Sequence, residues 1–155
     1  MTKQTCFHKI DSSGIATITL NRPEAHNALD GPTVLSLIKS LRELEENTSV
    51  RSIVLKSSGK NFCAGADLKW LRDSNDNQTK EYSQVGLKLA ELMWKLYVHP
   101  KPTIALVKGA AFGGGAGLVA CCDIALAASD AHFCFSEVRL GLIPSVISPY
   151  IVRAI

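Results

Sequence analysis

The sequence predicts a mixed α/β domain, and three observations support this fold class. Its 155 residues, 46% hydrophobic and 20% charged, match the length and composition of one globular domain. Short β-branched runs alternate along the chain with longer segments whose apolar residues recur at helical spacing. No internal repeat or low-complexity segment interrupts this order, so we expect one domain over residues 1–155.

The first third of the chain predicts two strands, a helix and a third strand. Residues 5–10 and 15–20 are strand-like runs on either side of a Ser-Ser-Gly turn. Asp30 is a candidate N-cap for a helix over 33–46, which has a proline at its start and one apolar face. A strand over 51–56 follows.

The middle of the chain predicts a loop and two helices. The loop covers 59–67, a short helix begins near Asp67, and a polar turn is expected at 73–78. A longer helix over 79–98 ends before Pro100, because a proline disfavours helix in the residue that precedes it.

The last third predicts a buried strand over 103–107, a small-residue helix that begins within the glycine-rich segment 109–117, and strands over 123–128 and 132–135. The predicted order of elements is therefore ββαβααβαββ.

Charged residues are scarce in the second half of the chain. Residues 103–151 contain five, which are Lys108, Asp123, Asp130, Glu137 and Arg139. Such a stretch has to be covered on most sides. Residues 150–155 look like helix interior without a C-cap. We therefore expect that a C-terminal part is missing and that this chain alone self-associates.

Several classes of function are disfavoured by composition. The net charge of +3 without a basic cluster argues against nucleic-acid binding. No apolar run reaches the roughly 18 residues of a membrane helix, and the N-terminus lacks a secretory signal, so we expect a cytoplasmic protein without a membrane partner. The five cysteines form no C-x-x-C pair and the histidines are scattered, which predicts free thiols and no metal site.

Two loops of small residues are candidates for binding negative charge. One is residues 62–67, Phe-Cys-Ala-Gly-Ala-Asp, and the other is the glycine-rich segment 109–117. Each lies between a strand and a helix, where backbone N–H groups point outward. Two such loops side by side could aim two donors at one oxygen and form an oxyanion hole from main chain alone. The alternative is that the small residues only allow close packing of helix on strand.

A second motif points to a different cofactor. Residues 115–120 fit G-x-G-x-x-A, and Glu137 lies 22 residues after Gly115. This pattern resembles a dinucleotide-binding fingerprint, which would imply a nicotinamide cofactor. The motif is misplaced, however, because seven residues separate it from its strand and a further strand precedes Glu137.

Glu137 is the candidate acid or base. It is the only glutamate after Glu91 and stands among apolar residues, where a carboxylate can hold or release a proton for catalysis. An ion pair with Arg139 is the structural alternative. No Ser-His-Asp or Cys-His arrangement supports a nucleophilic mechanism.

These residues resemble the crotonase (enoyl-CoA hydratase/isomerase) superfamily from Ile15 to Ile155. The segment Asn21-Arg22-Pro23 to Asn27-Ala28-Leu29 resembles the coenzyme A-binding segment of that family, and residues 62–68 and 113–115 resemble its two oxyanion-hole loops. The resemblance implies a crotonase-like ββα spiral core, which C-terminal helices complete into a homotrimer or hexamer.

The same resemblance implies an acyl-CoA thioester as substrate, with coenzyme A as part of that substrate and no separate cofactor. It assigns the oxyanion hole to the N–H groups of Ala64 and Gly114, and the acid–base role to Glu137. The other implied substrate or coenzyme A contacts are Arg22, Ala25, His26, Ala66, Asp67, Leu68, Gly113 and Ser136.

Which reaction we expect depends on one position at which this sequence differs from the family pattern. Family hydratases usually carry two glutamates, and the positions that match them here are Gly117 and Glu137. A single glutamate suits the proton shuttle of Δ3,Δ2-enoyl-CoA isomerases, whereas residues 136–150 resemble hydratases of branched or dicarboxylic enoyl-CoAs, of the methylglutaconyl-CoA type. We expect hydration of a short or branched 2-enoyl-CoA. The alternatives are an isomerase and a non-catalytic acyl-CoA-binding relative.

Overall fold

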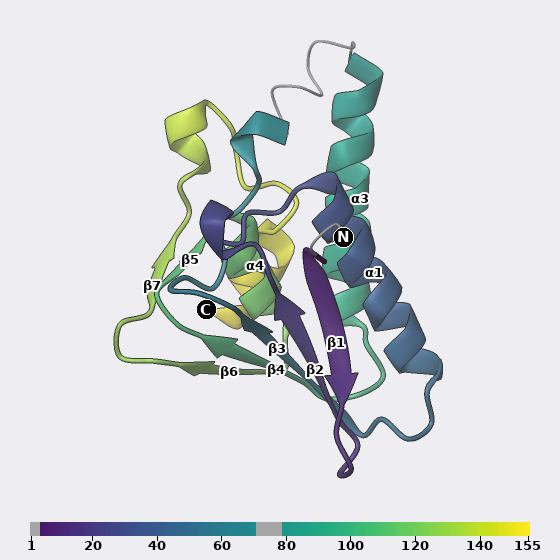
Figure 1. Cartoon of the computed structure of the whole chain (residues 1–155). Helices are drawn as coiled ribbons and strands as arrows, with labels where there is room; N and C mark the ends of the chain where they lie inside the picture. Colours follow the sequence, from purple (N-terminus) through teal and green to yellow (C-terminus); the bar gives the residue numbers. More distant parts are fainter. Residues whose placement is uncertain (1–3, 71–78) are drawn as a thin grey trace.

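The fold is built on a five-stranded sheet with the order β1-β2-β3-β4-β6 (Figure 1). A computed structural model describes residues 4–70 and 79–155, with side chains throughout except at 79–85. Strand β1 (Cys6–Ile10) runs antiparallel to β2 (Ile15–Leu20), and β3 (Ser52–Ser57), β4 (Thr103–Val107) and β6 (Ile124–Ala127) run parallel to β2.

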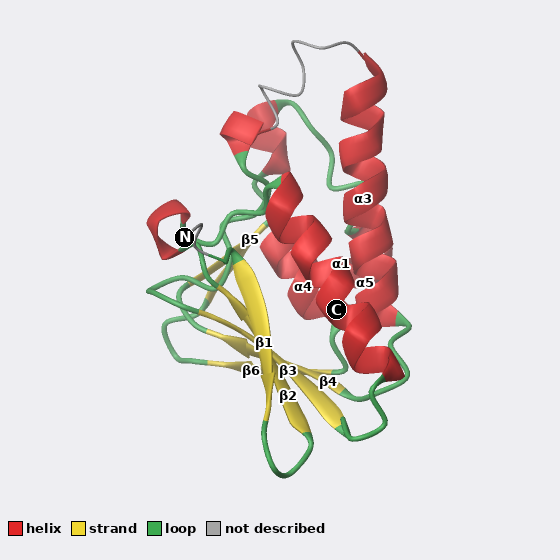
Figure 2. Ribbon diagram, turned by 45° about the vertical axis from the view of Figure 1, so that its right-hand side comes forward, coloured by secondary structure: helices red, strands yellow, loops and turns green. Residues whose placement is uncertain are grey.

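Helices α1 (Gly31–Glu46), α3 (Thr79–Tyr97), α4 (Gly114–Cys121) and α5 (Ser148–Ala154) gather on one side of the sheet (Figure 2). Parallel neighbours need crossover connections, and α1, α3 and α4 supply them between β2 and β3, β3 and β4, and β4 and β6. The predicted cap of the first helix is confirmed, because a carboxylate oxygen of Asp30 accepts the N–H of Thr33 at 2.9 Å.

The core lies between the helices and one face of the sheet. Alternate strand residues are buried there, as the period of two in a strand requires. The strands contribute Ala16, Ile18, Leu20, Ile53, Leu55, Ala105 and Val107, and the helices contribute Leu37, Leu41, Leu44, Leu92, Met93, Leu96 and Leu118.

A second, smaller layer follows the carboxyl ends of the strands. Strand β5 (Ala110–Phe112) pairs in parallel with β7 (His132–Cys134). Isolated bridges join Cys63 to Ala111 and Leu29 to Ala66. The sequence placed 110–112 inside a loop, because the three residues Ala-Ala-Phe are too short a run to predict a strand. This layer brings together the loops that follow β2, β3 and β4.

Two further predictions differ from the structure. Strand β7 ends at Cys134 rather than at residue 135, and Glu137 begins a 3₁₀ helix, η2 (Glu137–Leu140), that the sequence did not predict. The predicted short helix is present at 68–70, and the predicted turn at 73–78 lies outside the described residues.

The charge-poor second half is buried only in part. Most of β4 and α4 is buried, but Ile124, Leu126 and Phe133 are 50%, 58% and 50% exposed. Within this chain, therefore, β6 and β7 leave apolar side chains uncovered. Among the described residues, no helix is long and apolar enough to cross a membrane.

All five cysteines are free, as predicted. Burial raises the pKa of the Cys6, Cys63, Cys121 and Cys122 thiols to about 12. These thiols are therefore weak nucleophiles at neutral pH.

Candidate active site

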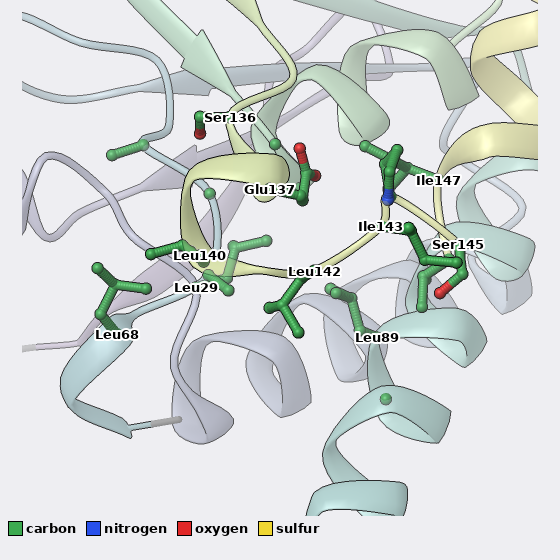
Figure 3. A pocket seen from close by; sticks show the side chains of 18 of the residues that line it. Leu29, Leu68, Leu89, Ser136, Glu137, Leu140, Leu142, Ile143, Ser145 and Ile147 are labelled. Atoms are coloured by element: carbon green, nitrogen blue, oxygen red, sulfur yellow. The ribbon is translucent and has the colours of Figure 1, made fainter. Parts of the chain in front are cut away.

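A cavity of about 410 Å³ opens beyond the carboxyl ends of the parallel strands (Figure 3). Its wall comes from the loop after β3, the start of α4, η2 and residues 142–147. The wall is mostly apolar, and among the described residues that line it only Glu137 and Arg139 carry a charged side chain. Pockets at this edge of a parallel sheet are a common place for ligand binding.

The bridge between Leu29 and Ala66 orients the first loop. The N–H of Leu29 donates to the carbonyl of Gly65 at 2.8 Å, and the N–H of Asp67 donates to the carbonyl of Leu29 at 3.0 Å. In such a parallel bridge the middle residue, Ala66, directs its own N–H and C=O away from the backbone of Leu29. Ala66 lines the cavity, and its N–H donates to no other described residue.

The neighbouring N–H groups of this loop are already engaged. Ala64 donates its N–H to the carbonyl of His26 at 3.0 Å, and the N–H of Gly65 bonds to the Cys63 thiol. The prediction that Ala64 supplies an oxyanion donor is therefore wrong, because pairing with the loop after β2 uses that N–H. The free donor of the loop is Ala66.

The second loop supplies the N–H of Gly114. This residue begins α4, so its N–H has no partner one turn earlier in the helix. The two loops approach closely through glycines: a Cβ atom at Gly65 would lie 2.9 Å from the carbonyl oxygen of Phe112 and 3.5 Å from the nitrogen of Gly114. Only glycine permits this contact, and it brings Ala66 and Gly114 to the same cavity.

Glu137 lies against the same helix start. A Cβ atom at Gly113 would be 3.1 Å from Oε1 of Glu137. The other oxygen, Oε2, is buried without a hydrogen-bond partner among the described residues. No ion pair with Arg139 is formed there, so the structural alternative for Glu137 lacks support. A buried carboxylate oxygen without a donor is costly unless a ligand or water supplies one.

The predicted substrate contacts divide into two groups. Ala66, Leu68, Gly113 and Ser136 line the cavity. Arg22, Ala25, His26 and Asp67 are not among its lining residues. Ala25 ends the 3₁₀ helix η1 (Pro23–Ala25), and the ring of His26 bonds through Nδ1 to the amide nitrogen of Asn61 at 2.9 Å.

Arg22 and Asp67 bind each other instead of facing the cavity. Nη2 of Arg22 is 2.9 Å from a carboxylate oxygen of Asp67, and Nη1 is 3.2 Å from one of Asp30. Burial alone would raise the pKa of the Asp67 carboxyl. The hydrogen bond and charge of Arg22, together with the N–H groups of Trp70 and Lys69, outweigh burial and lower that pKa below its usual value.

Two asparagines that were not among the predicted site residues join the loops of the site. Asn27 is 1% exposed, accepts the N–H of Arg22 at 2.8 Å, and donates to the carbonyls of Ser58 and Asn61 at 2.9 Å each. Asn61 in turn accepts the N–H of Ala110 at 3.0 Å. In the sequence, only the residue type of Asn27 could have indicated this role. Its backbone is left-handed, with φ of 56°, and asparagine tolerates that conformation better than most residues do.

A profile of the enoyl-CoA hydratase/isomerase family matches residues 11–155. The chain belongs to this family. The predicted crotonase resemblance and fold class are thereby confirmed.

Among curated members of the enoyl-CoA hydratase/isomerase family, the chain is 37% identical over 147 residues to a putative enoyl-CoA hydratase of Thermus thermophilus, covering 95% of this chain and 58% of the relative. It is 36% identical over 131 residues to the crotonyl-CoA hydratase of Syntrophomonas wolfei, covering 84% and 49%. The chain thus spans about half the length of the curated relatives it matches.

Two solved structures of the family superpose closely on this fold. A putative enoyl-CoA hydratase/isomerase (crotonase) from Legionella pneumophila matches with a TM-score of 0.92 at 48% identity, covering 97% of this chain and 57% of that one. An enoyl-CoA hydratase from Shewanella pealeana matches with a TM-score of 0.92 at 44% identity, covering 96% and 56%.

In this family member the G-x-G-x-x-A motif has a packing role. Strand β5 separates β4 from α4, so the motif does not follow its strand directly as a dinucleotide fingerprint does. A Cβ atom at Gly115 would be 2.4 Å from the carbonyl oxygen of Cys63, which explains the glycine. The nicotinamide alternative therefore has no structural support.

Proposed function

We propose that this chain is the acyl-binding core, over residues 1–155, of an enzyme that hydrates a short or branched 2-enoyl-CoA. One observation carries the proposal: the free N–H groups of Ala66 and Gly114 and the carboxylate of Glu137 line the same apolar cavity. The names of the two curated relatives support hydration as the reaction. The substrate brings coenzyme A with it, and the proposed reaction needs no other cofactor.

The two N–H groups act on the thioester carbonyl. Its oxygen accepts both donors, and it gains negative charge when the acyl group becomes an enolate. Donors fixed in place inside an apolar cavity stabilise such charge strongly, because they need no rearrangement during the reaction. Since both groups belong to the backbone, their positions depend on the loops rather than on side-chain identity.

Glu137 moves the proton. Its carboxylate takes a proton from water while the water oxygen bonds to C3, and the C2–C3 π electrons shift into the enolate. The carboxylic acid then returns that proton to C2 as the thioester carbonyl re-forms. One water molecule is added and Glu137 ends as a carboxylate, so one acid–base group is sufficient.

Isomerisation is the second candidate, and Gly117 favours it. Residue 117 offers no second carboxylate to hold water. A single Glu137 could remove a proton from C2 of a 3-enoyl-CoA and return it at C4, with a dienolate held by the same two N–H groups.

A paired assay of the full-length protein tests these proposals. Crotonyl-CoA reports hydration, and a 3-enoyl-CoA reports isomerisation. Loss of crotonyl-CoA that depends on Glu137 supports the hydratase. Conversion of the 3-enoyl-CoA alone identifies the isomerase, and binding without either reaction identifies a non-catalytic acyl-CoA-binding relative.

We also propose that the full-length protein is a homotrimer or hexamer. The exposed apolar side chains of β6 and β7, among them Ile124, Leu126 and Phe133, support further contacts on this face. The greater length of the matched relatives is consistent with additional covering segments.

A further inference from the structure

We propose that Arg22 is a positioning residue for the oxyanion hole, which holds the N–H of Ala66 in place through Asp30 and Asp67 and does not contact the substrate. The inference rests on the proposed function, in which the N–H of Ala66 binds the thioester oxygen. It replaces the expectation that Arg22 and Asp67 bind coenzyme A.

The two ion pairs of Arg22 lie next to a β-bridge along the chain. Leu29 and Ala66 form the bridge that orients the donor. The next residue on each side is an aspartate, Asp30 after Leu29 and Asp67 after Ala66. Arg22 contacts both carboxylates, at 3.2 Å and 2.9 Å. Its guanidinium therefore joins the two chain segments one residue beyond the bridge.

Further bonds hold the guanidinium and its backbone. Nη1 of Arg22 donates to the carbonyl of Ala28 at 2.7 Å, one residue before the bridge. The backbone N–H of Arg22 donates to the buried side chain of Asn27 at 2.8 Å. Arg22 thus contacts the segment around Leu29 on both sides of the bridge. The planar guanidinium, with donors in a fixed arrangement, is suited to such multiple contacts, whereas a lysine ammonium is not.

Both aspartates also accept a backbone N–H group in the first turn of a helix. Asp30 accepts the N–H of Thr33 at 2.9 Å, and Asp67 accepts the N–H of Lys69 at 3.0 Å. The side chains of Arg22, Asp30 and Asp67 are only 16% to 18% exposed, so water screens their interaction less than it would at the surface. The cluster is therefore a relatively rigid connection between two loops.

This connection affects the transition state more than the bound substrate. An oxyanion donor is effective only within hydrogen-bond distance of the developing charge, and a small displacement of a catalytic group lowers the rate strongly. Loosening the bridge would move the N–H of Ala66 while the cavity and its apolar wall remain. We therefore expect kcat to fall while substrate affinity is retained.

Kinetics of Arg22 variants in the full-length protein separate positioning from coenzyme A binding. Arg22→Met is expected to lower kcat for crotonyl-CoA by about tenfold to a hundredfold, with KM and the Kd for coenzyme A almost unchanged. Arg22→Lys keeps the positive charge but has a single nitrogen in place of the planar guanidinium, so it should recover part of kcat. Arg42→Met is the matched control, because Arg42 pairs with Glu91 on the exposed surface, and it should keep full activity. A loss of coenzyme A affinity with unchanged kcat in Arg22→Met would overturn the proposal.

Amide hydrogen exchange tests the positioning role of Arg22 independently of catalytic activity. In Arg22→Met the N–H groups of Leu29 and Asp67, which form the bridge, should exchange at least about tenfold faster, while those of the β2–β3 ladder stay protected. Unchanged exchange at the bridge would overturn the positioning role. If Arg22→Met does not fold, Asp67→Asn and Arg22→Lys are measured in the same way. An inactive wild-type protein with the expected exchange pattern would contradict the proposed function alone.

Discussion

Ile147 covers the space in front of Gly117. A Cβ atom at Gly117 would lie 2.3 Å from Cγ2 of Ile147 and 3.3 Å from Cε of Met93. Gly113 and Gly117 are one turn apart, since the N–H of Gly117 donates to the carbonyl of Gly113 at 3.0 Å. Glu137 lies against the first glycine and Ile147 against the second, and Figure 3 shows both side chains at the cavity. An apolar side chain thus covers the position of the second glutamate in family hydratases.

Restoring that glutamate requires a second change. Gly117→Glu alone should destabilise the protein by about 1–3 kcal/mol, because Ile147 already occupies the space that the new side chain needs, and it should not raise hydration. Gly117→Glu combined with Ile147→Gly should be more active in hydration than Ile147→Gly alone. Denaturant unfolding and the ratio of hydration to isomerisation measure both effects. Gly117→Glu with wild-type stability would show that Ile147 does not occupy this space in solution.

Glu137→Gln should reduce turnover by about a hundredfold or more, because the amide cannot carry the proton. Affinity for the acyl-CoA should change little, since the oxyanion donors are backbone groups on other loops. Arg139→Gln is the control for altered charge at the cavity, and it should retain the proton-transfer step. Steady-state kinetics and isothermal titration give the two quantities. Wild-type turnover in Glu137→Gln would exclude Glu137 as the acid–base group.

Proline substitutions distinguish the two alanines of the first loop. Ala66→Pro removes the free N–H and should cost about 3 kcal/mol of transition-state stabilisation with little loss of folding stability. Ala64→Pro removes the N–H that donates to His26 and should lower the free energy of unfolding by about 1 kcal/mol or more. Circular dichroism melting and kcat are compared for both. The opposite pattern would return the oxyanion role to Ala64.

The Arg22–Asp67 pair predicts a dependence of stability on pH. The pKa of Asp67 is lower in the folded protein than its usual value of 3.8. The folded state therefore favours the ionised carboxylate. Its contribution is fully present above about pH 5 and is lost as the pH falls through the folded pKa. The melting temperature of Asp67→Asn should be below that of the wild type at neutral pH, and the gap should close in acid. A gap that is independent of pH would mean that the charge of Asp67 does not stabilise the fold.

The exposed apolar strands predict self-association of the 155-residue chain. Leu126 and Phe133 are each at least half exposed, and apolar patches of this kind drive association. Sedimentation should show species larger than a monomer, and Leu126→Lys with Phe133→Lys should shift the chain toward the monomer. A wild-type chain that sediments as a monomer would contradict this expectation.

Much of the fold could be predicted from local pattern. The strands and the two long helices follow from apolar periodicity, and the cap at Asp30 follows from residue type. Strand β5 could not be predicted in this way. Its three residues form a strand only because β7 and Cys63 pair with it.

The loops and the acid–base residue of the site could be predicted from the sequence, but the hydrogen-bond partners of the loop N–H groups could not. Small residues at 62–67 and 113–115 indicated two loops with available N–H groups, and an isolated glutamate indicated the acid–base group. Which N–H remains free depends on the bridge between Leu29 and Ala66, which are far apart in the sequence. The choice of Ala64 was wrong for this reason.

The sequence by itself determined the α/β class, the family, and the residue types of the site, because these follow from local periodicity and from motifs in a fixed order. The tertiary structure decided that Ala66 rather than Ala64 has the free N–H, that Arg22 binds two aspartates, and that Ile147 covers Gly117. Each of these outcomes is a contact between segments that the chain brings together only on folding. The register of pairing and the space around a side chain are properties of that packing, so no local pattern encodes them.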